Sequence, residues 1–319
     1  MFKIANYNNA IKFRNDKWRH NPNIPNWVDI KTVELDQFFT VPEIAKKYYL
    51  QLLQFLNKKK IDIKNCVFIE PSAGAGSFFN LLPKSQSIGL DIYPISTNIM
   101  QQDFLSWEFP PEINNKVKIF IGNPPFGYRG WLALAFMNHA SKFADYIAFI
   151  LPMSFQSDGK GSPKNRVCGM KLEHSEIVPA NSFINPFGKI EKVNALWQIW
   201  EKGNNIQKEK PSCKKWIDIF TVDLRKERLC GMEKMENADY FLQRTFYNAP
   251  PKLVRSFSEV KYVCGYGLIF KKKKKYLEEI LNNANWVNYS NLAAHNCRHI
   301  SMYHIEKVLT DNNIIDAGL

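Results

Sequence analysis

The sequence of 319 residues lacks the features of several classes of protein. No apolar stretch approaches the roughly 18 residues of a membrane-spanning helix, so we expect no membrane partner. Residues 1–7 contain no apolar segment of the kind that a secretory signal requires. The six cysteines include no Cys-x-x-Cys pair, and scattered thiols suit a reducing compartment. We therefore expect a cytoplasmic protein of a prokaryotic cell, or of a virus that infects one.

Acidic residues are also scarce. The chain has 30 Asp and Glu against 43 Lys and Arg, which gives a net charge of +13. An excess of positive charge favours a polyanionic partner, and nucleic acid is the simplest one. The hydrophobic content of 45% is that of a globular protein, and the length allows one large domain or two modest ones.

The most informative feature is the tetrapeptide Asn123-Pro124-Pro125-Phe126, which follows the apolar run 117–122. A strand that ends in this way suits methyl transfer to a planar amino group. Such a nitrogen needs acceptors for its two N–H protons, and the Asn123 side chain and the Pro124 backbone carbonyl offer them. Phe126 offers a ring face for stacking. The alternative is a strand followed by a Pro-Pro turn.

Polar groups follow three earlier predicted strand ends. The run 67–70 ends in Glu70, and a glycine-rich turn with Gly74 and Gly76 follows it, where we expect a helix to begin. The next run ends in Asp91, a position that suits the ribose hydroxyls of an adenosine-type cofactor. Asp103-Phe104 then places an acid beside a ring, which suits adenine. Ligands bind at the carboxyl ends of strands in open α/β sheets, so these groups are expected to serve one ligand.

Together these segments resemble the S-adenosylmethionine-dependent amino methyltransferases, specifically the DNA adenine-N6 type with cofactor motifs ahead of the catalytic motif. The segment 36–45 resembles the family's Phe-x-Thr-Pro loop, although Val41 separates Thr40 from Pro42. The segments 148–155 and 194–200 are similar to its later strands. The resemblance implies a doubly wound α/β fold, a seven-stranded sheet with an antiparallel last strand, and S-adenosylmethionine as cofactor, with no metal.

The resemblance also implies roles for individual residues. The catalytic set is Asn123, Pro124, Pro125 and Phe126. The cofactor-binding set is Thr40, Glu70, Gly74, Gly76, Asp91, Asp103 and Phe104. Tyr128 is a further candidate for stacking on the substrate base.

We predict three regions: an irregular N-terminal arm (1–33), a methyltransferase domain (34–205) and a C-terminal target-recognition module (206–319). Helices are expected at 42–56 and 131–142, and a Gly, Ser and Lys-rich loop at 156–171. The C-terminal module contains five lysines, 271–275, flanked by aromatic residues, so Lys271, Lys272 and also Arg298 are candidate nucleic-acid contacts. A solvated lysine run before a helix is the alternative. His295, His299 and His304 only superficially resemble a metal site.

Several functions remain open. DNA adenine is the favoured substrate, and a duplex base would have to flip out of its stack. Amino groups of RNA adenine or guanine, the cytosine 4-amino group and glutamine side chains of proteins are chemically related substrates. A non-catalytic nucleic-acid-binding partner subunit belongs to a different class. The sequence does not give the target site or the oligomeric state.

Overall fold

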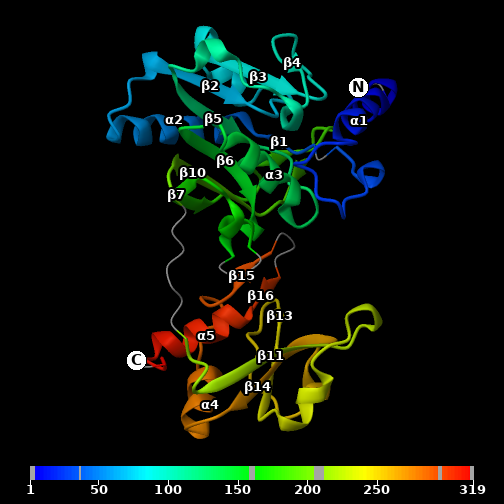
Figure 1. The fold of residues 1–319 in the computed structure, drawn as a ribbon, viewed down its shortest axis with the longest axis vertical. Coiled ribbons are helices and arrows are strands. Elements are labelled where there is room, and N and C mark those ends of the chain that lie inside the picture. Colours follow the sequence, from blue (N-terminus) through cyan, green and yellow to red (C-terminus); the bar gives the residue numbers. More distant parts are fainter. Residues whose placement is uncertain (1–3, 36, 158–161, 205–211, 294–296, 317–319) are drawn as a thin grey trace. The chain divides into compact units, whose positions relative to one another are not determined.

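The computed structural model describes residues 4–35, 37–157, 162–204, 212–293 and 297–316. Contacts divide the chain into two compact units (Figure 1). The first comprises Met1–Phe155 and Pro163–Ile206, and the second Gln156–Ser162 and Gln207–Leu319.

The first unit is built on a seven-stranded sheet with the order β4-β3-β2-β5-β6-β10-β7. The strands β4, β3, β2, β5 and β6 run parallel to one another, whereas β10 runs antiparallel to both β6 and β7. The predicted α/β sheet with a reversed last strand is therefore confirmed. The strands are β2 (Cys66–Glu70), β3 (Ser87–Asp91), β4 (Met100–Gln101), β5 (Val117–Gly122), β6 (Tyr146–Pro152), β7 (Met170–Ile177) and β10 (Ala195–Lys202).

Side chains of the central strands alternate between two apolar layers. In β5, Ile119 and Ile121 belong to the core that packs under α2 (Pro42–Lys58), while Phe120 contacts Phe104 on the other face. This alternation is the period of two expected for a strand. On the α2 face Trp197 stacks on Tyr48, with ring centroids 4.6 Å apart.

The prediction of a helix after the glycine turn is wrong. This segment forms a short 3-10 helix, η3 (Phe79–Leu81), and Leu82 after it is extended with ψ 152°. Pro83 explains this, because a residue that precedes proline is disfavoured in the α region. Within the described part of the first unit, the α-helices next to the sheet are α2 and α3 (Trp131–Ala140), which agree with the two helices predicted there.

The N-terminal arm is also more regular than predicted. Helix α1 spans Ile4–Trp18 and is followed by turns and the short helix η1 (Ile30–Thr32). The helix carries many polar residues, four of them asparagine, but Ala10 and Trp18 are buried. Tertiary contacts therefore hold this helix, as is usual where local helix preference is weak. The chain then enters β1 (Phe39–Thr40), which pairs with β8 (Phe183–Ile184), and β8 pairs with β9 (Ile190–Glu191).

The second unit is a small α+β structure. An antiparallel sheet with the order β11-β14-β12 packs against the helices α4 and α5 around Leu242, Leu268 and Ile305. Its elements are β11 (Ile217–Asp223), β12 (Tyr240–Gln243), β14 (Cys264–Phe270), α4 (Lys274–Asn282) and α5 (Met302–Asp311), with a second small sheet of β13 (Thr245–Phe246), β16 (Arg298–His299) and β15 (Asn291–Leu292).

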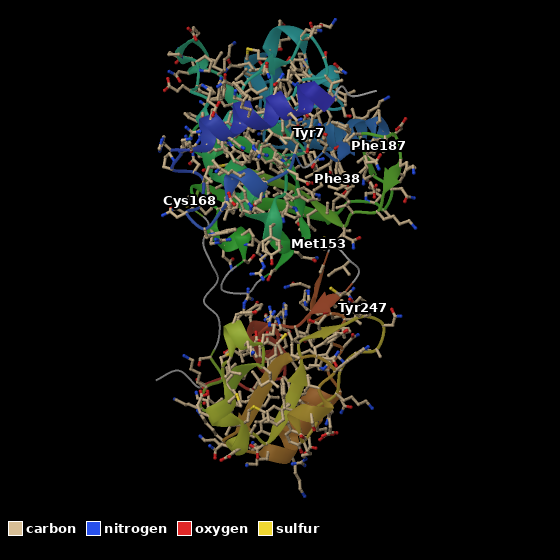
Figure 2. All side chains as sticks on the ribbon, turned by 90° about the vertical axis from the view of Figure 1, so that its right-hand side faces the viewer. Tyr7, Phe38, Met153, Cys168, Phe187 and Tyr247 are labelled. Atoms are coloured by element: carbon tan, nitrogen blue, oxygen red, sulfur yellow. The ribbon has the colours of Figure 1, made fainter. Side chains whose placement is uncertain are left out.

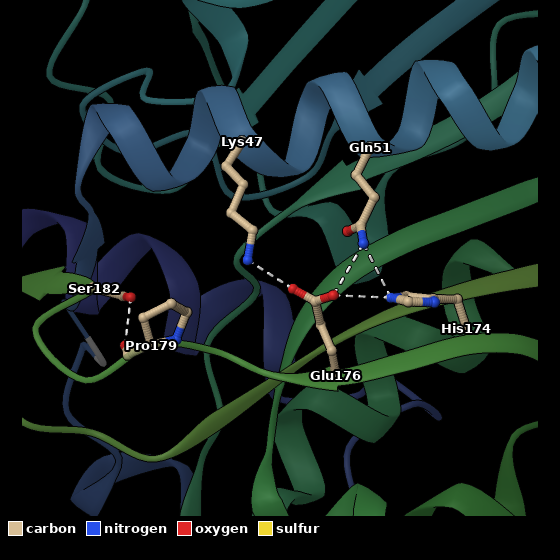
Figure 3. A network of polar contacts seen from close by, with 6 residues as sticks. All are labelled: Lys47, Gln51, His174, Glu176, Pro179 and Ser182. Atoms are coloured by element: carbon tan, nitrogen blue, oxygen red, sulfur yellow. Dashed lines mark hydrogen bonds and ion pairs between the residues drawn. The ribbon is translucent and has the colours of Figure 1, made fainter.

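A polar network joins α2 to the edge strand β7 (Figure 3). Glu176 accepts hydrogen bonds from Lys47 Nζ at 2.9 Å and from Gln51 Nε2 at 3.0 Å, and its Oε2 lies 3.3 Å from His174 Nε2. Burial alone would raise the pKa of Glu176, but the bonds from Lys47 and Gln51 outweigh it and lower the pKa to about 2. The charged form is therefore favoured by folding.

This network predicts a loss of stability in acid. The contribution is present above the ordinary pKa of 4.5 and is lost as the pH falls from there towards 2. Because the Lys47 and Glu176 side chains are partly exposed, we expect the network to contribute about 1 kcal/mol to stability, less than the full pKa shift would imply. Urea unfolding at neutral pH and near pH ~3 should show a smaller acid loss for Glu176→Gln than for the wild type. The exposed Glu112→Gln is the control, and equal acid losses in wild type and Glu176→Gln would contradict the prediction.

Candidate active site

One cavity, partly open to solvent, lies at the carboxyl ends of β2, β3 and β5. Two segments distant in sequence, α1 and the β1 region, complete its wall. Eight residues predicted from the sequence line it: Thr40, Glu70, Gly74, Asp91, Asp103, Phe104, Asn123 and Pro125. We call this space the Asn123 cavity.

The Asn123 side chain is held in one orientation. Its Nδ2 donates to the backbone carbonyl of Phe38 at 2.8 Å, and its backbone carbonyl accepts from Ser72 Oγ at 3.1 Å. Exchanging the two amide atoms would set Oδ1 against the Phe38 carbonyl oxygen, so this orientation is the favourable one. Oδ1 is buried and has no hydrogen-bond partner among the described residues. A buried acceptor without a donor costs about 1–3 kcal/mol, which a ligand with an N–H group would recover.

The glycine turn requires its glycines. Gly74 and Gly76 have φ of +50° and +82°. A Cβ on Gly76 would lie 2.9 Å from Asn80 Nδ2, and one on Gly74 would lie 3.0 Å from the Phe39 ring. The Gly74 N–H donates to Asp91 Oδ2 at 2.7 Å, which ties the turn to the end of β3. Gly76 shapes the turn but does not line the cavity.

Two carboxyl groups near this turn are perturbed. Burial raises the pKa of Asp91, against the opposing effect of N–H donation from Tyr93 and Gly74. Glu70 is only 3% exposed, and burial raises its pKa well above the usual range. Its Oε2 has no hydrogen-bond partner within the described segments. Paired shifts of this kind in a cavity are typical of functional sites.

The third carboxylate is held by a segment that sequence reasoning missed. Asp103 accepts from Trp18 Nε1 at 3.1 Å and from Ser106 Oγ at 2.7 Å. Arg14 lies 4.7 Å above the Trp18 ring and is 1% exposed. It donates to backbone carbonyls of residues 30, 33 and 34. The signal available in the sequence was the i, i+4 spacing of Arg14 and Trp18, which puts both on one face of a helix.

Other predicted residues lie outside the cavity. Pro124 is buried, and Phe126 is half-buried against the core under α2. Tyr128 is 68% exposed and lines a neighbouring groove. Phe126 therefore lies in a different environment from Asn123, and its stacking role stays a prediction.

The three remaining candidates belong to the second unit. Lys271 Nζ donates to the Lys214 carbonyl at 3.0 Å, and Lys272 Nζ lies 5.8 Å from the centre of the Trp216 ring. Arg298 Nη1 donates to the Val287 carbonyl at 3.0 Å. Each of these cations thus has a structural contact in addition to any role towards a ligand.

The described residues contain no group of three His, Cys, Asp or Glu that could hold a metal ion. His295 and Asn296 of the histidine-containing segment lie outside them. None of the helices in the described ranges is long and apolar enough to cross a membrane.

Comparisons with known proteins give only distant likenesses. No family model matches the chain, and no curated protein does. A structure from Pyrococcus horikoshii, provisionally assigned as an RNA methyltransferase, is 18% identical over 53% of this chain and 89% of its own, with a TM-score of 0.38. Magnesium protoporphyrin IX methyltransferase from Synechocystis PCC 6803, with S-adenosylmethionine bound, is 12% identical over 62% and 97%, with a TM-score of 0.36.

A third similar structure is the type IIG restriction endonuclease BpuSI. It is 15% identical over 59% of this chain and 27% of its own, with a TM-score of 0.36. None of these likenesses carries an argument about the substrate. The fold of the first unit is established by its own strand order and directions.

Proposed function

We propose that the chain transfers a methyl group from S-adenosylmethionine to the N6 amino group of adenine in DNA. The observation that carries this proposal is Asn123 Oδ1, a buried acceptor without a partner on the wall of a cavity. The glycine turn, Asp91 and Asp103 line the same cavity. The motif at Asn123 and the residues suited to an adenosine-type cofactor are therefore close enough to serve one reaction.

The residues present fit the proposed cofactor. Asp91 offers a carboxylate to ribose hydroxyls, and the Asp103 carboxylate beside the buried Phe104 ring suits an adenine. Glu70, with its partnerless Oε2, offers an acceptor to the cationic methionine end. When bound, S-adenosylmethionine supplies an activated methyl group on a sulfonium, which is a good leaving group.

The chain's own contribution is to position and polarise the amino group. Asn123 Oδ1 and the Pro124 backbone carbonyl accept the two N–H protons, which directs the nitrogen lone pair out of the ring plane. Pro124 does not line the cavity in the structure, so this role requires the bound base to reach its carbonyl. As the nitrogen gains positive charge, the N–H bonds to these fixed oxygens strengthen, and this stabilises the transition state. No covalent intermediate is needed. The nitrogen then loses one proton to solvent, and the methylated base leaves.

The decisive experiment identifies the product. The protein is incubated with S-adenosylmethionine and a mixture of DNA and RNA, and the nucleosides are then analysed by mass spectrometry. N6-methyladenine in DNA is the expected product. Methylation only in RNA, or only at cytosine, would contradict adenine in DNA as the substrate but would leave methyl transfer itself in place. Absence of any transfer from radiolabelled cofactor, with nucleic-acid binding retained, would favour a non-catalytic binding subunit.

A polyanionic substrate also predicts a strong salt dependence of binding. If the lysines 271–275 contact phosphates, replacing all five with glutamine should lower the slope of log affinity against log salt by about 0.9 per lost contact. We expect fewer than five contacts, since Lys274 already pairs with Asp239 at 2.5 Å. Lys226→Gln with Lys234→Gln, at exposed sites in the same unit, is the matched control. An unchanged slope in the five-lysine variant would mean that the run is only a solvated surface.

A further inference from the structure

A second, wider hollow adjoins the Asn123 cavity in the first unit. Its volume, which includes space open to solvent, is about 3090 Å³. Phe38 and Leu132 line both spaces, so the two are adjacent. Figure 2 shows Tyr7, Phe38 and Phe187 on one side of this unit, and all three line the hollow. We call it the aromatic groove, after Trp27, Tyr128 and Phe187.

These three rings are unusually exposed for their size. Trp27 is 65%, Tyr128 68% and Phe187 87% exposed. A single exposed aromatic residue needs no explanation, but several that line one hollow mark a surface for binding. Ring faces that are left in water beside a candidate active site suit a ligand with planar groups of its own.

The most exposed ring is held by an ordered turn. Phe187 stands between β8 and β9, where Asn185 Oδ1 accepts the N–H groups of Phe187 at 2.9 Å and Lys189 at 3.1 Å. Gly188 completes the turn with φ +77°. Because β8 also pairs with β1, the hairpin that presents Phe187 is joined through the sheet to the segment that holds Asn123.

The other two rings are supported as well. Tyr128 follows the Asn-Pro-Pro-Phe-Gly loop, and the Arg129 guanidinium lies 4.9 Å from its ring centre. Arg129 has φ +57°, a conformation that costs free energy in a non-glycine residue and is found preferentially at functional sites. Trp27 packs edge-on against Trp131, with centroids 6.2 Å apart.

Exposed cations occur in the segments that line the groove. Lys31, Arg129 and Lys192 each adjoin a lining residue in the sequence, and Lys189 lies two residues from Phe187; we call these four the rim cations. Two of the three lining acids serve local structure. Asp29 Oδ1 accepts the Lys31 N–H at 3.0 Å, and Glu191 Oε1 accepts from Asn185 Nδ2 at 2.7 Å. Aromatic faces with cations around them are the pattern that binds unpaired nucleic acid.

We propose that the aromatic groove binds an unpaired stretch of the nucleic-acid strand whose target base enters the Asn123 cavity. This inference rests on the proposed function and adds to it a preference for unpaired substrate. Bases next to the target would stack on Tyr128, Trp27 and Phe187, while the rim cations neutralise phosphates. In a duplex the base faces are covered by their neighbours and cannot reach these rings, so a strand that is already open avoids the cost of unstacking.

The test compares affinities for one labelled oligonucleotide as a single strand and as a perfect duplex, at fixed salt and with S-adenosylmethionine present. We expect the wild type to prefer the single strand. Phe187→Ala and Tyr128→Ala should each weaken single-strand binding about tenfold. Phe187→Trp should retain it because it keeps a ring face. Ile190→Ala is the matched control, since Ile190 is 60% exposed on the same hairpin and does not line the groove.

Equal affinity for single strand and duplex would overturn the proposal. So would an equal loss in Phe187→Ala and Ile190→Ala, or no loss in either ring variant. Cofactor affinity measured by calorimetry on each variant separates misfolding from a lost contact. The failure of the proposed function is distinguishable, because a protein that methylates neither DNA nor RNA can still show the single-strand preference and its loss in the ring variants.

Discussion

Replacing Asn123 with alanine should cut the rate of methyl transfer by about 10²–10³-fold while leaving the affinity for S-adenosylmethionine nearly intact. The side-chain oxygen has no partner among the described residues, and nothing in the proposed cofactor site demands it. It therefore acts only when an amino group enters the cavity. Turnover measured with saturating substrate, together with calorimetric titration of the cofactor, would separate the two effects.

Two further variants sharpen this test. Asn123→Asp keeps the Oδ1 acceptor but loses the donor to the Phe38 carbonyl, so it should also be strongly impaired. Asn98→Ala removes an asparagine side chain from an exposed turn and should leave turnover unchanged. Near-normal methylation by Asn123→Ala would reduce the tetrapeptide to a Pro-Pro turn, and the proposed reaction would lose its main support.

The parts of the site that could be predicted from sequence share one property. Each is a polar residue at the end of an apolar run, and the geometry of a parallel sheet brings such ends together. Glu70, Asp91 and Asn123 were found in this way, and all three line one cavity. The seven strands and the antiparallel last strand could be expected only through the family resemblance, since runs of apolar residues do not specify which strands pair.

The parts that could not be predicted depend on contacts between distant segments. Trp18 and Asp103 are joined by a side-chain hydrogen bond across 85 positions, and no local pattern in the polar N-terminal arm predicts this contact. The same holds for Phe126, whose ring lies against the core although its neighbour Pro125 lines the cavity. The missing helix after the glycine turn is different, because Pro83 was a local signal that outweighed the glycine pattern.

Replacing Asp91 with alanine should weaken binding of S-adenosylmethionine by about 1–3 kcal/mol, a loss of up to about two orders of magnitude in affinity. Two effects add. The variant removes a charged acceptor from ribose hydroxyls, and it frees the Gly74 N–H that Asp91 Oδ2 holds at 2.7 Å. Calorimetric titration measures the loss directly, without any nucleic acid.

The pH dependence of this affinity identifies the group responsible. Only the ionised carboxylate can accept from the Gly74 and Tyr93 N–H groups and from two hydroxyls at once. Since burial raises the pKa of Asp91, wild-type affinity should fall as the pH drops towards that raised value and recover above it. Asp91→Asn cannot titrate, so it should be weak throughout and lack this fall. Trp18→Phe, which removes one donor to Asp103 but leaves Asp91 intact, is the control that should keep the fall.

If Asp91→Ala and Asp103→Ala both bound the cofactor as the wild type does, the ligand would have to lie elsewhere, and the cavity beside Asn123 would need a different occupant.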